Sequence, residues 1–185
     1  MQLKFVTGNT GKVRELRTIL NTDVTQLPLR LPEIQAIDVD DVIRSKAEQA
    51  YKEVGTPVLV EDTGLTFAAW NGLPGALVKW FMDTVGSAGI CQMLREENNR
   101  CAFAKCTFDL YDGKDHHLFS GIVSGTLAYE PRGEGGFGWD DIFIPEGYNC
   151  TFAEMPEEEK DRISMRKLAL DKLQKFVVDL AITQK

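Results

Sequence analysis

Two neighbouring runs of alternating side chains constrain the fold of this chain more than any other feature. Residues 101–111 and 118–129 alternate between apolar and polar positions, and Asp112-Gly113 lies in the segment between them. Alternation with a period of two places every second side chain on one face of a sheet, and Asp-Gly is a preferred hairpin turn. The sequence therefore predicts a long β-hairpin.

Helical and strand patterns intermix through the rest of the 185 residues. We expect further strands at residues 3–7, 57–60 and 139–144. We expect helices at residues 12–20, 40–54, 75–85, 87–97 and 162–181, with Ser87 as the N-cap of the fourth. This order predicts an α/β or α+β fold around a mixed sheet. No linker or repeat divides the chain, so we expect one domain over residues 1–185, or two small lobes around a shared cleft.

Composition excludes several classes of function. The net charge is −7, from 21 Lys and Arg against 28 Asp and Glu, and no basic run is present. This argues against a nucleic acid as the main partner, although a few lysines and a divalent cation would still suit a small anion. No apolar run approaches the roughly 18 residues of a membrane span. The four cysteines form no CxxC pair, which favours reduced thiols and a cytoplasmic location.

The segment FVTGNTGK, residues 5–12, combines a strand, a glycine-containing turn and the start of a helix. Backbone N–H groups at such a helix start suit a phosphate, and Lys12 adds a positive charge. The spacing does not match a Walker loop, because Gly8 and Gly11 enclose two residues and Val13 follows the lysine. An ordinary strand-to-helix turn is the alternative interpretation.

A second segment, VLVEDTGLTF at residues 58–67, places two adjacent carboxylates at the end of an apolar strand. Such carboxylates can ligate a hard divalent cation or orient a water molecule. Because adjacent strand residues point to opposite faces, at most one of Glu61 and Asp62 faces a given partner directly. A solvated acidic turn is the alternative.

Two further segments carry aromatic and basic groups. In RGEGGFGWDDIF, residues 132–143, the glycines match G-x-G-x-x-G, but a strand follows where the dinucleotide fingerprint needs a helix. Phe137 and Trp139 could instead form a flat slot for an aromatic base, unless they pack into the core. In AEMPEEEKDRISMRK, residues 153–167, Lys160, Ser164 and Arg166 follow a helix start at Pro156. A solvated helix entrance would explain that segment equally well.

Together these segments make a specific pattern. TGNTGK, LPE at 31–33, Lys46, VEDTGL, GLPG followed by Lys79, GGFGWD and AEMPEEEKDRIS-x-R occur in this order over nearly the whole chain. The chain thereby resembles the inosine triphosphate pyrophosphatase family, and its GLPG-x-x-x-KWF and EDT segments look more like the eukaryotic branch.

The resemblance implies a function and a fold. Members of this family hydrolyse the non-standard purine nucleoside triphosphates ITP, dITP and XTP to the monophosphate and pyrophosphate. They use Mg²⁺, for which Mn²⁺ could substitute, and usually work as homodimers. Their fold is a long curved mixed β-sheet flanked by helices, in two lobes around a central nucleotide cleft.

The resemblance also assigns roles residue by residue. Catalysis would fall to Asp62, Glu61 and Lys12, with Asp62 as the essential carboxylate. The metal would be held by Glu33, Glu61 and Asp62. The triphosphate and the base would be bound by Thr7, Gly8, Asn9, Lys12, Lys46, Thr63, Phe137, Gly138, Trp139, Asp140, Lys160, Ser164, Met165 and Arg166.

The chain departs from the family pattern at two positions. Met165 stands between Ser164 and Arg166, where the family usually has the histidine of a Ser-His-Arg sequence. A methionine can neither donate a strong hydrogen bond nor carry a charge. If the histidine contacts the nucleotide, its loss weakens binding by about 0.5–1.5 kcal/mol. Asp141 replaces a common proline, for which we expect a small change of the loop. Two alternatives remain: a Maf-like pyrophosphatase of other modified nucleotides, and a catalytically silent nucleotide-binding protein.

Overall fold

The computed structural model describes residues 3–20 and 24–183 and is built around one long mixed sheet. Within these residues the sheet has seven strands, in the order β2-β1-β3-β5-β6-β7, and β4 also pairs with β3. The pairs β1–β2 and β1–β3 are parallel, and all other pairs are antiparallel. The strands are β1 (Lys4–Val6), β2 (Thr25–Leu27), β3 (Val58–Phe67), β4 (Pro74–Gly75), β5 (Cys101–Tyr111), β6 (His116–Leu127) and β7 (Phe143–Pro145).

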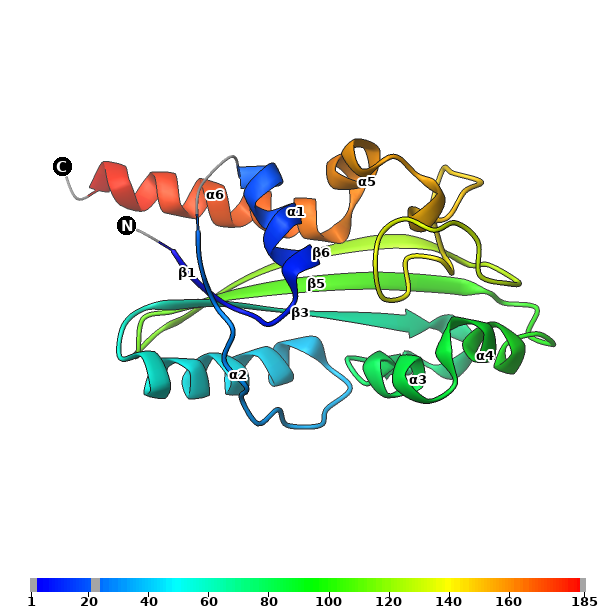
Figure 1. Cartoon of the computed structure of the whole chain (residues 1–185), viewed down its shortest axis with the longest axis horizontal. Coiled ribbons are helices and arrows are strands. Elements are labelled where there is room, and N and C mark those ends of the chain that lie inside the picture. The colour runs from blue at the N-terminus through cyan, green and yellow to red at the C-terminus, as the bar shows by residue number, and fades with distance from the viewer. Residues whose placement is uncertain (1–2, 21–23, 184–185) are drawn as a thin grey trace.

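Helices cover both faces of the sheet (Figure 1). On one face lie α1 (Thr10–Leu20), α5 (Glu157–Ile163) and α6 (Met165–Thr183). On the other lie α2 (Val39–Val54), α3 (Val78–Thr84) and α4 (Gly86–Met93). Two short 3-10 helices complete the secondary structure, at Ala68–Trp70 and Phe152–Glu154. The predicted mixed sheet flanked by helices is confirmed.

The predicted hairpin forms the middle of the sheet. Its first strand has the predicted bounds, and its second begins at His116, two residues earlier than expected. The prediction for β3 is wrong in length, because the strand continues through the two carboxylates to Phe67 instead of ending on them. The reason is its partner: β5 pairs with β3 from Val58 to Phe67, so the Thr-Gly pair stays extended.

Three other predicted elements differ from the structure. Ser87 is no N-cap: it lies inside α4, which begins after Val85. The strand predicted over 139–144 is reduced to β7, because residues 139–142 form turns. The last helix is interrupted at Ser164, whose extended backbone separates α5 from α6.

A gap along the edge of β3 opens the site. β1 pairs with β3 only at Leu59, and β4 pairs with β3 only at Leu65 and Thr66. Between these contacts, the edge of β3 at residues 61–63 pairs with neither short strand. Glu61 and Asp62 therefore lie where the sheet is open on one side.

The core consists of two apolar clusters. The larger one includes Phe5, Leu59, Phe108 and Leu170, and it also takes in Ile90 of α4. The smaller one packs Val58 and Val60 against α2 residues such as Ile43 and Ala47. In the described residues no helix is long and apolar enough to span a bilayer.

Gly121 allows α6 to approach the sheet closely. A Cβ at this position would lie 2.0 Å from the carbonyl oxygen of Met165 and 2.8 Å from the backbone nitrogen of Ala169. Since both are backbone atoms, the helix would have to move. We expect Gly121→Ala to lower the free energy of unfolding by about 1–3 kcal/mol in urea denaturation. Ser124→Ala, at an exposed position of the same strand, is the control and should change it by less than about 0.5 kcal/mol. Equal stability of the two variants would contradict this packing.

Candidate active site

A cleft of about 610 Å³ lies beside the open edge of β3. Three parts of the chain form its walls: the β1–α1 turn, the segment from residue 76 to 83 with residues 33–36, and the loop at residues 137–140. The volume falls within the range of small-molecule sites, about 300–1,000 Å³. Most predicted site residues line it, namely Thr7, Gly8, Asn9, Lys12, Glu33, Lys46, Asp62, Thr63, Phe137, Gly138, Trp139, Asp140, Met165 and Arg166.

The β1–α1 turn is ordered by its own side chains. The backbone N–H of Asn9 donates to Thr7 Oγ1 at 3.1 Å, and Asn9 Oδ1 accepts from the N–H of Lys12 at 3.2 Å. Asn9 therefore caps α1, which the spacing of the motif did not reveal. Gly8, Asn9 and Lys12 at this helix start line the cleft, and the partial positive charge of a helix start is favourable for a phosphate.

Glu61 and Asp62 point to opposite faces of the sheet, as the alternation of a strand requires. Asp62 lines the cleft, whereas Glu61 is 1% exposed and is not among the described residues that line it. Lys12 contacts both, with Nζ at 2.7 Å from Glu61 Oε2 and 3.9 Å from Asp62 Oδ1. Lys12 thus joins the floor of the cleft to the buried layer beneath it.

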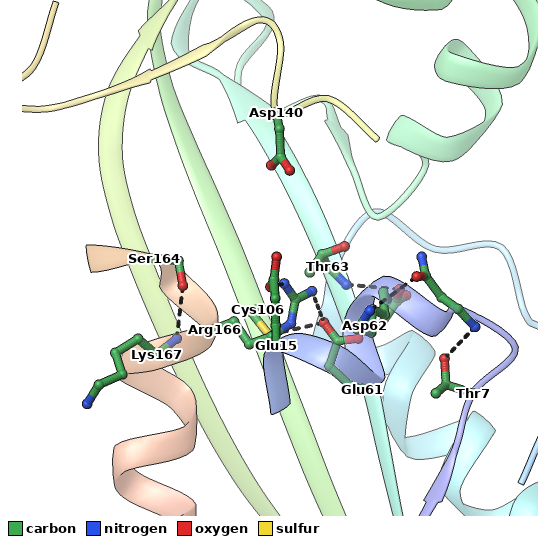
Figure 2. A network of polar contacts seen from close by, with 12 residues as sticks. Thr7, Glu15, Glu61, Asp62, Thr63, Cys106, Asp140, Ser164, Arg166 and Lys167 are labelled. Atoms are coloured by element: carbon green, nitrogen blue, oxygen red, sulfur yellow. Dashed lines mark hydrogen bonds and ion pairs between the residues drawn. The ribbon is translucent and has the colours of Figure 1, made fainter. Parts of the chain in front are cut away.

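That buried layer is a network of charges from three helices, a strand and a loop. Figure 2 shows its members Glu15, Glu61, Asp140 and Arg166. Arg166 of α6 pairs with Glu15 of α1 and, at 2.9 Å, with Glu61 Oε1. Lys160 of α5 lies 2.8 Å from Glu15 Oε1 and 2.5 Å from Asp140 Oδ2. Each of these side chains is at most 5% exposed. Charges this deeply buried are tolerated because each has an opposite partner.

The network sets the charge of Glu61. Burial alone would raise its pKa, but the nearby Lys12 and Arg166 outweigh burial and lower the pKa to about 2. The thiol of Cys106 adds a hydrogen bond to Glu61 Oε1 at 3.2 Å. Its own pKa is raised by burial and by Glu61, so the thiol stays protonated and donates. Glu61 is therefore an anion throughout the physiological range.

The pKa of Asp62 is shifted in the opposite direction to that of Glu61. Burial, assisted by the charge of Glu61, raises its pKa, while Lys12 and Lys46 act against that rise. One Asp62 oxygen accepts the backbone N–H of Thr63 at 2.9 Å. A carboxylate with a raised pKa at the floor of a cleft is suited to accept a proton.

A second ion pair lines the cleft. Lys46 Nζ is 2.7 Å from Glu33 Oε1 and 3.5 Å from the carbonyl oxygen of Glu61. Desolvation would raise the pKa of Glu33, but Lys46 outweighs it and lowers that pKa. Glu33 thus adds a second negative charge, besides Asp62, to the lining of the cleft.

Both rings of the loop at residues 137–140 line the cleft, but one is partly exposed and the other is mostly packed into the core. Trp139 is 7% exposed and contacts Phe143 edge-on, while Phe137 stays partly exposed. Asp140 accepts the N–H of Phe137 at 2.7 Å and pairs with Lys160, which fixes the loop. Lys160 Nζ lies 4.7 Å from the centre of the Phe137 ring. A Cβ at Gly11 would lie 2.9 Å from that ring, so the glycine allows the ring to pack against α1.

Two predicted substrate ligands lie beneath the cleft. Ser164 is fully buried, and its Oγ accepts the N–H of Lys167 at 3.2 Å, which caps α6 (Figure 2). Lys160 is 3% exposed and bound within the network. Ser164 therefore caps the helix that carries Arg166, and Lys160 holds the loop at residues 137–140 through Asp140. The alternative of a solvated helix entrance is wrong. Met165 lines the cleft but is 2% exposed and belongs to the apolar core.

Comparison with known proteins agrees with this geometry. The model of the Ham1 family matches residues 3–176. The chain belongs to the Ham1 family.

Similar Ham1 proteins come from distant organisms. An inosine triphosphate pyrophosphatase of the yeast Yarrowia lipolytica is 46% identical over 98% of both chains. A dITP/XTP pyrophosphatase of Thermococcus kodakarensis is 45% identical over 92% of this chain and 94% of its own. The structure of a HAM1 protein from Coxiella burnetii superimposes with a TM-score of 0.84 at 27% identity, covering 96% of this chain and all of that one.

The structure also brings in residues that no role was predicted for. Glu15 is buried at the centre of the network, although a charged side chain that follows Arg14 in a helix gave no sign of burial. Lys79 and Trp80 line the cleft from α3, and Trp80 Nε1 donates to Gln35 Oε1. The sequence did contain a signal for this wall of the cleft. It is the GLPG segment followed by Lys79, which belongs to the sequence pattern of the Ham1 family.

The pKa of Glu61 gives a testable dependence of stability on pH. Its pKa is about 2 in the folded state against an ordinary 4.5, so its charge stabilises the fold above pH 4.5 and that stabilisation is lost as pH falls towards 2. The contribution is about 3 kcal/mol at neutral pH and under half of that at pH 3. We expect the destabilisation caused by Glu61→Gln to be about 2 kcal/mol smaller at pH 3 than at pH 7.

Urea denaturation at both pH values measures this difference. Glu53→Gln, which alters an exposed carboxylate of α2, is the matched control and should show no such dependence. A Glu61→Gln effect that is the same at both pH values would show that Glu61 is not held as a buried anion.

Proposed function

We propose that this protein hydrolyses ITP, dITP and XTP to the nucleoside monophosphate and pyrophosphate, and so removes non-standard purines from the nucleotide pool. One observation carries the proposal: Asp62 lies on the floor of a cleft with a phosphate-type helix start at one side and an aromatic loop at the other. The names of the Yarrowia and Thermococcus relatives support the substrate class.

The triphosphate would lie along the β1–α1 turn. Thr7, Gly8 and Asn9 offer hydroxyl and backbone donors, and Gly8 leaves open space where a side chain would stand. Lys12 and Lys46 bring positive charge from one side, and Lys79 from the opposite wall. Fixed cations of this kind stabilise the charge that develops on the phosphates during the reaction.

Mg²⁺, with Mn²⁺ as a substitute, would be held by Glu33 and Asp62. Within residues 3–20 and 24–183 no group of three or more His, Cys, Asp or Glu forms a metal site. Two carboxylates that line one cleft nevertheless fit Mg²⁺, which usually takes one or two carboxylates and completes its shell with water and phosphate. When bound, the ion would neutralise phosphate charge. Glu61 is committed to Lys12 and Arg166, so we assign it to the support of Lys12 instead.

Asp62 would orient the attacking water and accept its proton. The water oxygen forms a bond to the α-phosphorus, the bond between that phosphorus and the bridging oxygen to the β-phosphate breaks, and pyrophosphate leaves. An ionised carboxylate at this position can orient or deprotonate the water. Lys12 is held by Glu61 and stays positive. Burial would lower its pKa, but the charges of Glu61 and Asp62 outweigh burial and raise it.

Base selection would rest on hydrogen-bond donors. Hypoxanthine and xanthine carry an O6 acceptor where adenine has an N6 donor, and a guanidinium such as that of Arg166 can only donate. Glu15 and Glu61 hold this guanidinium, and its Nε has no partner among the described residues. A site built to donate leaves adenine unpaired, and such mismatches discriminate by up to about 10⁴–10⁵. Phe137 would stack on the base.

The family resemblance also supports a homodimer in the cytoplasm. All four cysteines are free thiols, which suits a reducing compartment. We retain one domain over residues 1–185, since α1 and α6 from opposite ends of the chain share the buried network.

A panel of nucleoside triphosphates tests the proposed activity. We expect pyrophosphate release from ITP, dITP and XTP in the presence of Mg²⁺, with kcat/KM for ATP and GTP lower by several orders of magnitude. Detection of pyrophosphate and orthophosphate in parallel identifies the bond that is cleaved. Comparable turnover of ATP, or orthophosphate as the product, would overturn the proposal, and binding of ITP without cleavage would indicate a silent binding protein.

Asp62→Asn tests the assignment of the base. The substitution keeps the shape and removes the charge, so kcat should fall by about 10²–10⁴ while KM for ITP changes by only a few fold. Asp115→Asn, in the exposed hairpin turn, is the control and should retain full activity. Near-normal kcat in Asp62→Asn with unchanged dependence on Mg²⁺ would remove Asp62 from the mechanism.

A further inference from the structure

Helix α4 begins without a cap of its own. Its N-cap position, Val85, supplies no side-chain hydrogen bond in the described structure, and the first turn contains no acidic residue. The first N–H groups of any helix are unpaired and carry partial positive charge, so a carboxylate brought from elsewhere is favourable there.

Asp141 brings that carboxylate from a distant part of the sequence. Ser87, the second residue of α4, donates its hydroxyl to Asp141 Oδ1 at 2.7 Å across 54 residues of sequence. Both residues are partly buried. A hydrogen bond to an ionised acceptor is among the stronger ones in proteins.

This contact joins two walls of the cleft. Asp141 directly follows the loop of residues 137–140, and its carbonyl oxygen accepts the N–H of Arg132 at 2.8 Å. On the other side, Val85 is both the C-cap of α3 and the N-cap of α4, so no loop separates the two helices. The position of Ser87 therefore also determines the position of α3. Ser87 Oγ also lies 3.9 Å from the sulfur of Met82, which lines the cleft.

α4 has a second attachment at its far end. The thiol of Cys91 donates to the carbonyl oxygen of Ala128 at 3.2 Å, within the buried core. Loss of the Ser87 contact would therefore leave α4 docked and release only the end that leads into the cleft wall. The residues on that wall are Leu77, Val78, Lys79, Trp80, Met82 and Asp83.

We propose that the hydrogen bond between Ser87 and Asp141 is a positioning contact that fixes the separation of these two walls and so sets the affinity for the nucleotide. It does not touch the reacting atoms, since Asp62, Glu33 and Lys12 belong to other elements. The inference rests on the proposed function and extends it to residues outside the cleft.

Steady-state kinetics with ITP tests the contact. We expect Ser87→Ala and Asp141→Ala each to raise KM by about three- to tenfold, with kcat within twofold of the wild type. Because both remove the same bond, the double variant should raise KM no further than either single one. Ser87→Thr keeps the hydroxyl and should restore most of the affinity. Ser124→Ala, at an exposed position of β6, is the control.

Each outcome decides the question. An unchanged KM with a lowered melting temperature would assign the pair to stability alone, and additive effects on KM would show that the two residues act separately. Either result overturns the inference.

The wild type in the same assay separates the two proposals, because absence of pyrophosphate release from ITP refutes the proposed function. In that case the dissociation constants of ITP for the same variants, measured by calorimetry, test the contact directly. If the wild type does not bind ITP either, the inference fails with the function.

Discussion

The buried pairing of Arg166 with Glu15 and Glu61 is the interaction on which the rest of the site depends. It joins the first turn of α6 to the middle of α1 and to the centre of β3. Removal of one member of such a group leaves an uncompensated charge in the interior, which typically costs about 3–5 kcal/mol. The network also reaches the surface of the cleft through Lys12, and it reaches the loop at residues 137–140 through Lys160 and Asp140. Groups that would bind phosphate and base are thus held by one electrostatic unit below them.

The unequal lengths of the strands give this unit its access to solvent. β1 ends early and β4 is very short, so β3 carries Glu61 and Asp62 past the end of one neighbour before it reaches the other. The alternation of the strand then separates two carboxylates of nearly the same chemistry. Glu61 is kept ionised under the sheet, with a pKa of about 2, and Asp62 on the cleft side has a raised pKa. One dipeptide therefore supplies a structural anion and a candidate base.

Local patterns predicted those parts of the molecule that depend on neighbours in sequence. The alternation of side chains predicted the hairpin of β5 and β6. The turn residues after β1 predicted helix α1. Strand geometry predicted that Glu61 and Asp62 point to opposite faces. The continuation of β3 was missed, because pairing with β5 outweighs the turn preference of Thr63-Gly64. Glu15 was missed for the same kind of reason: only Lys160 and Arg166, far away in sequence, make its burial favourable. Ser87 was taken for a cap, and its actual partner, Asp141, lies in another segment.

The distance in sequence between Glu15 and Arg166, 151 residues, has a consequence for how the chain acquires its site during synthesis. A nascent chain folds from its N-terminus, and contacts between its two ends form only after nearly all of it has been made. An incomplete chain would already contain the phosphate turn and Asp62, but Glu15 and Glu61 would lack the arginine that makes their burial tolerable. Assembly of the site is thereby coupled to the synthesis of α6, and a fragment without α6 should not form the floor of the cleft.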